Sequence, residues 1–334
     1  MLRKSASCAD SHWPSIPAAR GPSPAARVTA PRRELLPLRG QRSGDSRKRG
    51  GTPVSNDPLN VPPRQLGQGS GCRCEVVDDS VALAHHFADT MAAEFLDAKS
   101  RARPFIVFIV PVGPVGQFEI FAQRCNEMQM SLRDLVLINM DEYLTSEHDY
   151  IETRDALSFR AHMERALWSR LDPALAPPRV QRHFPDPGDP QATNRLIERC
   201  GGVDVAFGGV GINGHLAFNE PPEPGESVDN EAFANLPTRI VALSRETRTI
   251  NAVTATRGNI DRIPRTAITV GMREILEARK IRLYLNRPWQ CAIVRKLLHG
   301  PITAAVPASL VRHHPDVQVT MTREVTQLPE PVLR

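Results

Sequence analysis

Two segments of this chain carry side chains that could move protons during a reaction. The first runs from position 208 to 221 and contains His215 and Glu220 among several glycines, and the second begins with Asp141. An imidazole can carry a proton near neutral pH, and a neighbouring carboxylate can hold it in one orientation. A partly buried carboxylate can serve as a base that removes a proton from carbon. These residue types therefore predict acid–base chemistry.

Short apolar runs at 135–139 and 203–207 precede the two segments. Their length and composition predict buried strands of a parallel sheet. Open α/β sheets bind ligands at the carboxyl ends of their strands, where both segments would then lie. Glycines in such a loop let a ligand approach the backbone closely, so we predict substrate contacts at Gly209, Gly211 and Gly214.

The rest of the body alternates between strand-like and helix-like patterns. Helices are predicted at 81–96, from 118 onward, and at 156–171, 190–200, 289–299 and 307–313. Further strands are predicted at 105–110, 238–243, 266–270, 281–285 and 317–321. This alternation predicts a Rossmann-like, doubly wound α/β fold with a mostly parallel sheet covered on both faces.

Residues 1–70 differ in composition from the rest of the chain. They hold 12 basic and 4 acidic residues, a net charge of +8, whereas the remaining residues hold 30 basic and 33 acidic, a net of −3. The segment is also rich in proline, arginine and serine, which predicts a disordered extension ahead of one α/β domain at 71–334. We interpret it as a passive extension; an Arg-rich transit peptide and a basic arm for an acidic partner are the alternatives.

The composition of the body bears on several other classes of protein. It has no apolar run of about 18 residues, so we expect no membrane partner. Its slight acidity argues against a nucleic-acid surface. The six cysteines are scattered, and Cys72 and Cys74 lack the second pair that a zinc site needs, which favours a reduced, cytoplasmic protein without a bound metal.

The motifs of the two segments resemble those of the glucosamine-6-phosphate deaminase (isomerase) family. The run 139–143 reads NMDEY, and 208–221 reads GGVGINGHLAFNEP, close to that family's GxDGHxAFNEP signature. Two downstream stretches, at 238–251 and 263–271, follow in the same order. Several ordered motifs are a more specific signal than one glycine fingerprint. The resemblance covers residues 75 to 325 and implies a single domain of the sugar-phosphate isomerase type.

The resemblance also implies roles for particular residues. Asp141 would be the carbon base, and His215 would open the sugar ring with Glu220 and Asn213 beside it. The predicted substrate-binding residues are the three glycines named above together with Gly113, Arg248 and Glu142. We expect Glu142 to lie behind Asp141. The implied reaction is aldose–ketose isomerisation followed by hydrolysis of an imine, and it needs no metal or organic cofactor. The ligand would be a small sugar or sugar phosphate. Members of the family range from monomers to hexamers, so the resemblance is also compatible with a homo-oligomer.

The chain departs from this family at the positions that would bind a phosphate. Asn213 stands where the motif has Asp, which keeps the shape but removes a negative charge beside the imidazole. The family's PTGGTP loop reads PVGPVG at 111–116, with fewer hydroxyl and N–H donors. Its phosphate-binding Arg and Lys align with Val253 and Gln290. We therefore hypothesise that the carbon chemistry is kept while the distal group of the sugar differs from the usual 6-phosphate.

Two other functions compete with this interpretation. A 6-phosphogluconolactonase-like hydrolase shares part of the loop around His215, but Phe218, Asn219 and Glu220 favour the deaminase form. A non-catalytic sugar-binding regulatory protein would explain the altered phosphate loop and Asn213. It would not explain Asp141, because a protein that only binds sugar needs no carbon base.

Overall fold

The computed structural model describes residues 57–114 and 116–331, and its centre is a sheet in which all neighbouring strands are parallel. The order of the seven strands across the sheet is β1 (Arg73–Val77), β10 (Val317–Thr322), β9 (Lys280–Leu285), β6 (Val205–Gly208), β2 (Ile106–Val110), β3 (Leu135–Asn139) and β5 (Arg182–His183). The predicted α/β fold with a mostly parallel sheet is thus confirmed.

Burial explains why these strands have unbroken apolar sequences. Every residue of β2 and β3 is buried, because helices cover both faces of the sheet. Strand β2 pairs with β3 on one side and with β6 on the other, so the carboxyl ends of these three strands lie next to one another. Phe108 and Phe207 meet edge to face between β2 and β6 and help to fix this arrangement.

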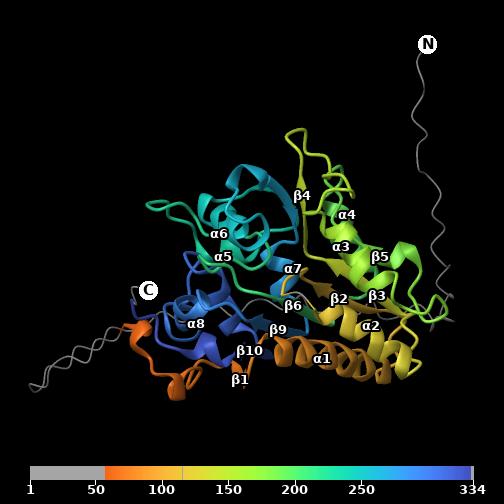
Figure 1. The fold of residues 1–334 in the computed structure, drawn as a ribbon, viewed down its shortest axis with the longest axis horizontal. Helices are drawn as coiled ribbons and strands as arrows, with labels where there is room; N and C mark the ends of the chain where they lie inside the picture. The colour runs from red at the N-terminus through yellow and green to blue at the C-terminus, as the bar shows by residue number, and fades with distance from the viewer. Residues whose placement is uncertain (1–56, 115, 332–334) are drawn as a thin grey trace, which may run out of the picture. The chain divides into compact units, whose positions relative to one another are not determined.

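Several helices begin where a short polar side chain accepts hydrogen bonds from free backbone amides. Asp79, for example, accepts from the amides of Val81 and Ala82 and so starts the longest helix. The helices are α1 (Ser80–Ser100), α2 (Gln117–Glu127), α3 (Phe159–Met163), α4 (Gln191–Arg199), α5 (Asn230–Ala234), α6 (Arg245–Ala255), α7 (Met272–Leu276) and α8 (Gln290–His299). Figure 1 shows α1 and α2 side by side along the parallel sheet. Among the described residues, none of the helices could cross a membrane.

Three short strands form a second sheet that the sequence pattern did not predict. Its order is β4 (Asp141–Leu144), β8 (Thr266–Thr269) and β7 (Arg239–Ala242), and both pairings are antiparallel. We expected 238–243 and 266–270 to join the parallel sheet, and that expectation was wrong. Strand β8 pairs instead with β4, which follows β3 after the single residue Met140, and β7 pairs with the other edge of β8.

Smaller differences from the predictions have local causes. The helix expected at 156–171 begins at Phe159, after the Ser158 side chain caps it, and changes to a π-helix (Glu164–Trp168). The segment Pro307–His313 is a 3-10 helix. Strands β1 and β5 were not predicted, since β1 is largely exposed and β5 has only two residues.

A buried arginine holds the start and the end of the described chain against α8. The guanidinium of Arg295, fully buried, donates to the carbonyl oxygens of Val61 (2.9 Å), Cys291 (2.9 Å), Thr326 (2.7 Å) and Gln327 (2.8 Å). The segment 57–70, which we assigned to the extension by composition, therefore packs on the folded body. The remainder of the predicted extension, 1–56, lies outside the described residues.

Candidate active site

Asp141 belongs to a row of three side chains on one face of the second sheet. Asp141 on β4 is directly opposite Thr269 on β8, and Thr269 is directly opposite Arg239 on β7. Residues directly opposite each other on neighbouring strands point to the same face, while successive residues alternate. Asp141, Thr269 and Arg239 therefore share a face, and Glu142 points to the other.

This face of the second sheet contacts the loop that carries His215. The amide of Phe218 donates to Thr269 Oγ1 at 2.9 Å, and a guanidinium nitrogen of Arg239 donates to Asn219 Oδ1 at 2.7 Å. The ring of Phe218 also lies 6.1 Å from that of His215. The structure therefore brings the segment of Asp141 and the segment of His215 to one edge, as the two motifs predicted.

Three polar side chains form a connected network around the imidazole. His215 Nδ1 lies 2.9 Å from Asn213 Oδ1, 3.3 Å from Glu220 Oε2 and 3.2 Å from Thr247 Oγ1. Glu220 Oε2 in turn accepts from Asn213 Nδ2 at 2.7 Å and from Thr247 Oγ1 at 3.1 Å. We call His215, Glu220, Asn213 and Thr247 the relay network. The predicted neighbours of His215 are therefore in contact with it.

The residue that precedes α6 supplies a further donor to the Glu220 carboxylate. The amide of Ser244, the residue that caps α6, donates to Glu220 Oε1 at 3.3 Å. Burial alone would raise the pKa of Glu220, but the hydrogen bond and charge of His215, with the hydrogen bonds of Asn213 and Thr247, lower it to about 2. Glu220 is therefore ionised over the pH range in which an imidazole works.

We expect Glu220→Gln to destabilise the protein by about 1.5–3 kcal/mol near neutral pH, the range for hydrogen bonds to a charged group. A pKa lowered from the usual 4.5 to about 2 means that the folded protein binds fewer protons here than the unfolded chain. The stabilisation is present above about pH 4.5 and is lost as the pH falls toward about 2. Urea unfolding of both proteins across this window tests this, and a pH-independent difference would contradict it.

The carboxyl group of Asp141 is in a very different environment. It is 7% exposed, and no hydrogen bond or ion pair reaches it from the residues that the structure describes. Burial and the neighbouring Glu142 carboxylate raise the pKa of Asp141 to about 8. A carboxylate with a pKa near neutrality is a much stronger base than an exposed one, as proton abstraction from carbon requires.

Glu142 does not have the environment of a substrate ligand. It is fully buried, and its two oxygens accept from the amides of Phe159 (3.1 Å) and Arg160 (2.9 Å) and from the hydroxyl of Ser158 (3.2 Å). These donors are the free groups at the start of α3. The structure thus contradicts the predicted substrate contact of Glu142, because its side chain faces α3 from the opposite side of β4.

Two of the predicted glycines have clear steric roles beside the imidazole. A Cβ atom on Gly211 would lie 2.1 Å from Cε1 and Nε2 of His215, so the ring rests directly on the glycine backbone. Gly214 has a φ of +92°, a conformation that side chains with a Cβ rarely adopt. A Cβ on Gly209 would lie 3.9 Å from the carbonyl oxygen of Gly113, which shows that the loops after β2 and β6 are neighbours.

The two positions that align with the family's phosphate-binding Arg and Lys carry no cation in this chain. Val253 is 62% exposed on α6, and Gln290 is buried with its amide used internally. Gln290 Oε1 accepts from the amide of Arg287, and Nε2 donates to the carbonyl of Val210, both at 2.8 Å. Arg248 donates to the carbonyl of Ile260 at 3.1 Å, so its substrate contact stays a prediction.

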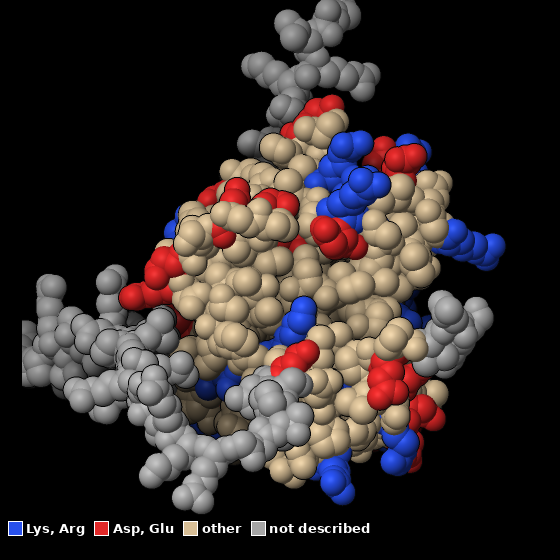
Figure 2. All heavy atoms as spheres, turned by 90° about the vertical axis from the view of Figure 1, so that its left-hand side faces the viewer, with Lys and Arg blue, Asp and Glu red and all other residues tan. Residues whose placement is uncertain are grey.

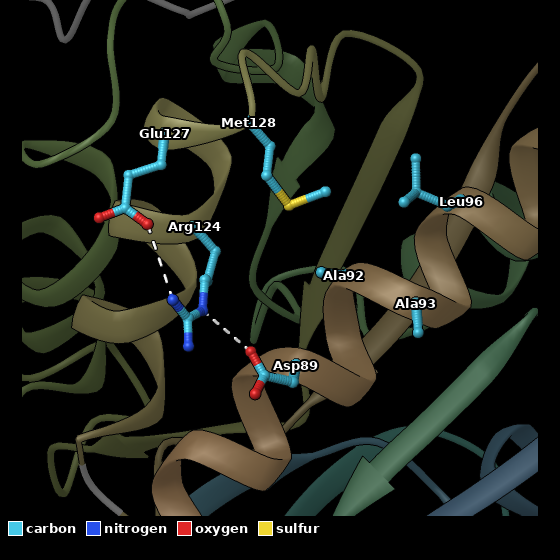
Figure 3. Close-up of a pocket in the computed structure, with 7 residues that line it drawn as sticks. All are labelled: Asp89, Ala92, Ala93, Leu96, Arg124, Glu127 and Met128. Carbon is cyan, nitrogen blue, oxygen red and sulfur yellow. Dashed lines mark hydrogen bonds and ion pairs between the residues drawn. The ribbon is translucent and has the colours of Figure 1, made fainter.

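Two hollows of similar size lie on the surface of the described residues, and one of them touches the relay network. This hollow, of about 410 Å³, lies between the His215 loop and α6 and is lined by Ile212, Asn213, Arg245, Glu246, Thr249 and Ile250. The other, about 420 Å³, lies between α1 and α2 (Figure 3). There Arg124 is paired with Asp89 and Glu127, so its charge is already neutralised.

On the face that carries α5, α6 and α8, acidic and basic side chains are interspersed (Figure 2).

Sequence reasoning missed Thr247 as a member of the site. Its position in a motif was noticed, but a threonine in a helix gives no sign of what it contacts. The one available signal is its spacing from Ser244, because Ser followed three residues later by Thr at a helix start places both in the first turn. Arg239 and Thr269 were missed for the related reason that the second sheet was not predicted.

Comparison with known proteins adds independent evidence. No family model matches the chain. It is 30% identical over 236 residues to a glucosamine-6-phosphate deaminase of Lachnoclostridium phytofermentans, covering 68% of this chain and 92% of the relative. It is 31% identical over 251 residues to a glucosamine-6-phosphate deaminase of Bacillus velezensis, covering 72% of this chain and 95% of the relative.

Solved structures of related proteins also resemble this chain. A structure described as a monomeric glucosamine-6-phosphate deaminase of the NagB superfamily superposes with a TM-score of 0.63 at 26% identity, covering 76% of this chain and 98% of that one. A 6-phosphogluconolactonase from Trypanosoma brucei shares the fold, with a TM-score of 0.54 at 13% identity over 76% of this chain and 97% of that one. The identity and coverage of the sequence relatives show that the chain belongs to the glucosamine-6-phosphate deaminase family.

Proposed function

We propose that the protein is an isomerase and deaminase that acts on an amino sugar. This sugar can be unmodified, phosphorylated or modified in another way. The observation that supports this most strongly is the pair of environments at one edge of the fold. Asp141 is a buried carboxyl group with no partner among the described residues and a pKa near neutrality, while His215 is held in a network with an ionised Glu220. Such a pair suits one base for carbon and one acid–base group for oxygen.

The proposed reaction assigns a separate proton to each group. His215, through Nε2, moves the proton that opens the sugar ring and exposes the aldehyde at C1. Asp141 then removes the proton from C2 and returns it to C1, while a proton passes from the C2 nitrogen to the C1 oxygen, which leaves a hydroxyl at C1 and an imine at C2. Water adds to this imine and releases ammonia, so the products are a ketose and ammonia. Glu220 stabilises the imidazolium that forms when His215 takes up its proton.

The distal end of the sugar is where we propose that this chain differs from its relatives. Gln290 has both ends of its amide engaged, and Val253 offers only an apolar side chain, so neither can neutralise a phosphate. Pro114 has no N–H to donate. Arg287, exposed in the loop between β9 and α8 and three residues before Gln290, is a candidate cation to replace them. These features support a substrate with an uncharged or differently placed distal group.

The experiment measures ammonia and ketose formation with glucosamine 6-phosphate and glucosamine tested side by side. Asp141→Asn serves as the control for contaminating activity. We expect ammonia release with a preference that differs from that of the phosphate-binding relatives. Efficient turnover of glucosamine 6-phosphate would overturn the altered distal group but not the chemistry. Binding of either sugar without turnover would instead favour a regulatory, non-catalytic protein.

A further inference from the structure

We propose that Asn219 is a positioning residue, which holds the pair formed by His215 and Glu220 in place against Asp141. The kinetic part of this inference rests on the proposed function. Asn219 is fully buried, and its side chain contacts neither the imidazole nor the Asp141 carboxyl group among the described residues. It acts on the reaction through the backbone segments that it joins.

The turn 216–219 sets the spacing between His215 and Glu220, which stand immediately before and after it. The amide of Asn219 donates to the carbonyl of Leu216 at 3.0 Å, and the side chain of Asn219 donates to the same carbonyl at 2.9 Å. Ala217 in this turn has a φ of +52°, a conformation that residues with a Cβ rarely adopt. The turn therefore depends on bonds that hold it closed, and the Asn219 side chain supplies one of them.

The Asn219 side chain also makes two of the three hydrogen bonds that, within the described chain, connect this turn to the second sheet. Its Nδ2 donates to the carbonyl of Val270, the residue directly after β8, at 2.9 Å. Its Oδ1 accepts from the guanidinium of Arg239 on β7 at 2.7 Å. The third is the bond from the amide of Phe218 to Thr269 Oγ1. Loss of the Asn219 amide would therefore leave the turn with a single bond to this sheet.

These contacts lead to the strand that carries the carbon base. The amide of Val270 donates to the carbonyl of Met140 at 2.7 Å, and Met140 directly precedes Asp141. The orientation of the Asn219 amide is fixed as well, because a guanidinium can only donate and a carbonyl can only accept. Both hydrogens and the oxygen of this amide are thus in use, and a leucine of similar shape can replace none of these bonds.

Three variants separate this role from a general effect on stability. Asn219→Leu removes all the side-chain bonds, whereas Arg239→Met removes the bond to Oδ1 and leaves the two that Nδ2 makes. Gln181→Leu is the matched control, because Gln181 is 2% exposed and its amide donates to the carbonyls of Arg133 at 2.8 Å and Leu135 at 2.9 Å. Leu135 is the first residue of β3, so this buried amide lies at the opposite end of the strand from the site.

The first readout is hydrogen exchange of backbone amides in the protein without substrate. We expect the amides of Phe218 and Asn219 to exchange at least about tenfold faster in Asn219→Leu than in wild type, because the turn opens more often. Arg239→Met should show a smaller acceleration, and it replaces the leucine variant if the latter does not fold. In Gln181→Leu the two amides should exchange at the wild-type rate. Unchanged exchange in both site variants would overturn the proposal.

The second readout compares turnover of the cyclic amino sugar with C2 proton exchange in an acyclic 2-amino aldehyde. The aldehyde lacks the hydroxyls that close a ring, so it needs the carbon base but not the ring-opening group. In Asn219→Leu we expect kcat for the sugar to fall about a hundredfold, the effect of a misplacement of about 1 Å, and exchange in the aldehyde to fall less than about tenfold. Equal falls for both compounds, or the same fall of kcat in Gln181→Leu, would contradict the positioning role.

The two readouts also separate this inference from the proposed function. If wild type turns over no amino sugar, the proposed function fails, while the expected pattern of amide exchange still supports the role of Asn219 in holding the turn. If amide exchange accelerates as expected but kcat stays at the wild-type value in Asn219→Leu and Arg239→Met, Asn219 holds the turn without positioning the acid–base pair. The proposal is then wrong.

Discussion

Asp141→Asn is expected to lower turnover of the amino sugar by about a thousandfold, within the range found when a general base is removed. The amide has nearly the same shape as the carboxyl group but cannot accept a proton from carbon. The measurement is kcat together with exchange of the C2 proton into deuterated water, which reports proton abstraction directly. Proton exchange at the wild-type rate in the variant would rule out Asp141 as the carbon base.

The same substitution is expected to make the protein more stable at high pH. The pKa of Asp141 is raised from 3.8 to about 8, so between these values the folded protein binds more protons than the unfolded chain. Stability therefore falls as the pH rises through this window. Asn removes the buried charge, and we expect the variant to melt about 2–4 °C above wild type near pH 9 for each kcal/mol gained, with little difference near pH 4.

Asp204→Asn provides the contrast, because Asp204 is also buried but is paired. It lies 2.8 Å from a guanidinium nitrogen of Arg103 and accepts from the amide of Val107 at 2.9 Å. Removal of one partner of a buried ion pair is destabilising, so this variant should melt below wild type at neutral pH. If both variants melted below wild type near pH 9, the unpaired state of the Asp141 carboxylate would be contradicted.

Gly211→Ala should lower kcat/KM by at least about a hundredfold, since misplacement of a catalytic group by 1 Å has effects of this size. The added methyl group would lie 2.1 Å from His215 Cε1, so the ring must leave its position against the backbone. Gly211 does not have a positive φ, and the backbone itself can accept alanine. The effect should therefore appear in activity and in the His215 NMR signal much more than in the melting temperature.

Gly209→Ala adds the same methyl group two residues earlier in the loop. Its nearest contacts would be carbonyl oxygens at 3.7 and 3.9 Å, which are ordinary distances, so the His215 signal should not change. The comparison separates displacement of the imidazole from a general effect on the loop. Equal changes in the His215 signal for the two variants would show that the close packing on Gly211 is not what places the ring.

The central sheet could be predicted because the apolar sequence of each central strand indicates by itself that the strand is buried. The runs that became β2 and β3 are apolar at nearly every position, and a strand of that kind has few other places in a fold. The second sheet could not be predicted in the same way. Its strand β4 begins with two acids, and it becomes a strand only because β8, more than 120 residues later, pairs with it.

The acid–base residues of the site could be predicted from the sequence, but the residues that hold them in position could not. Asp141, His215 and Glu220 each stand in a motif, whereas Thr247 joins them only through the fold, 32 positions from His215. Glu142 shows that closeness in the sequence can also mislead the prediction of a site. It is next to Asp141 in the sequence, but adjacent residues of a strand point to opposite faces, and so it caps α3 instead of contacting a sugar.

The arginine that joins the two ends of the described chain sets where the protein can be shortened. A version beginning at residue 71, the boundary that composition suggested, would lack the carbonyl of Val61. One nitrogen of a fully buried guanidinium would then have no acceptor, and Arg295 has no carboxylate nearby that could compensate among its described contacts. A version that begins at residue 57 keeps this acceptor. For expression and crystallisation, a shortened version should therefore begin at Asp57 and not at Gly71.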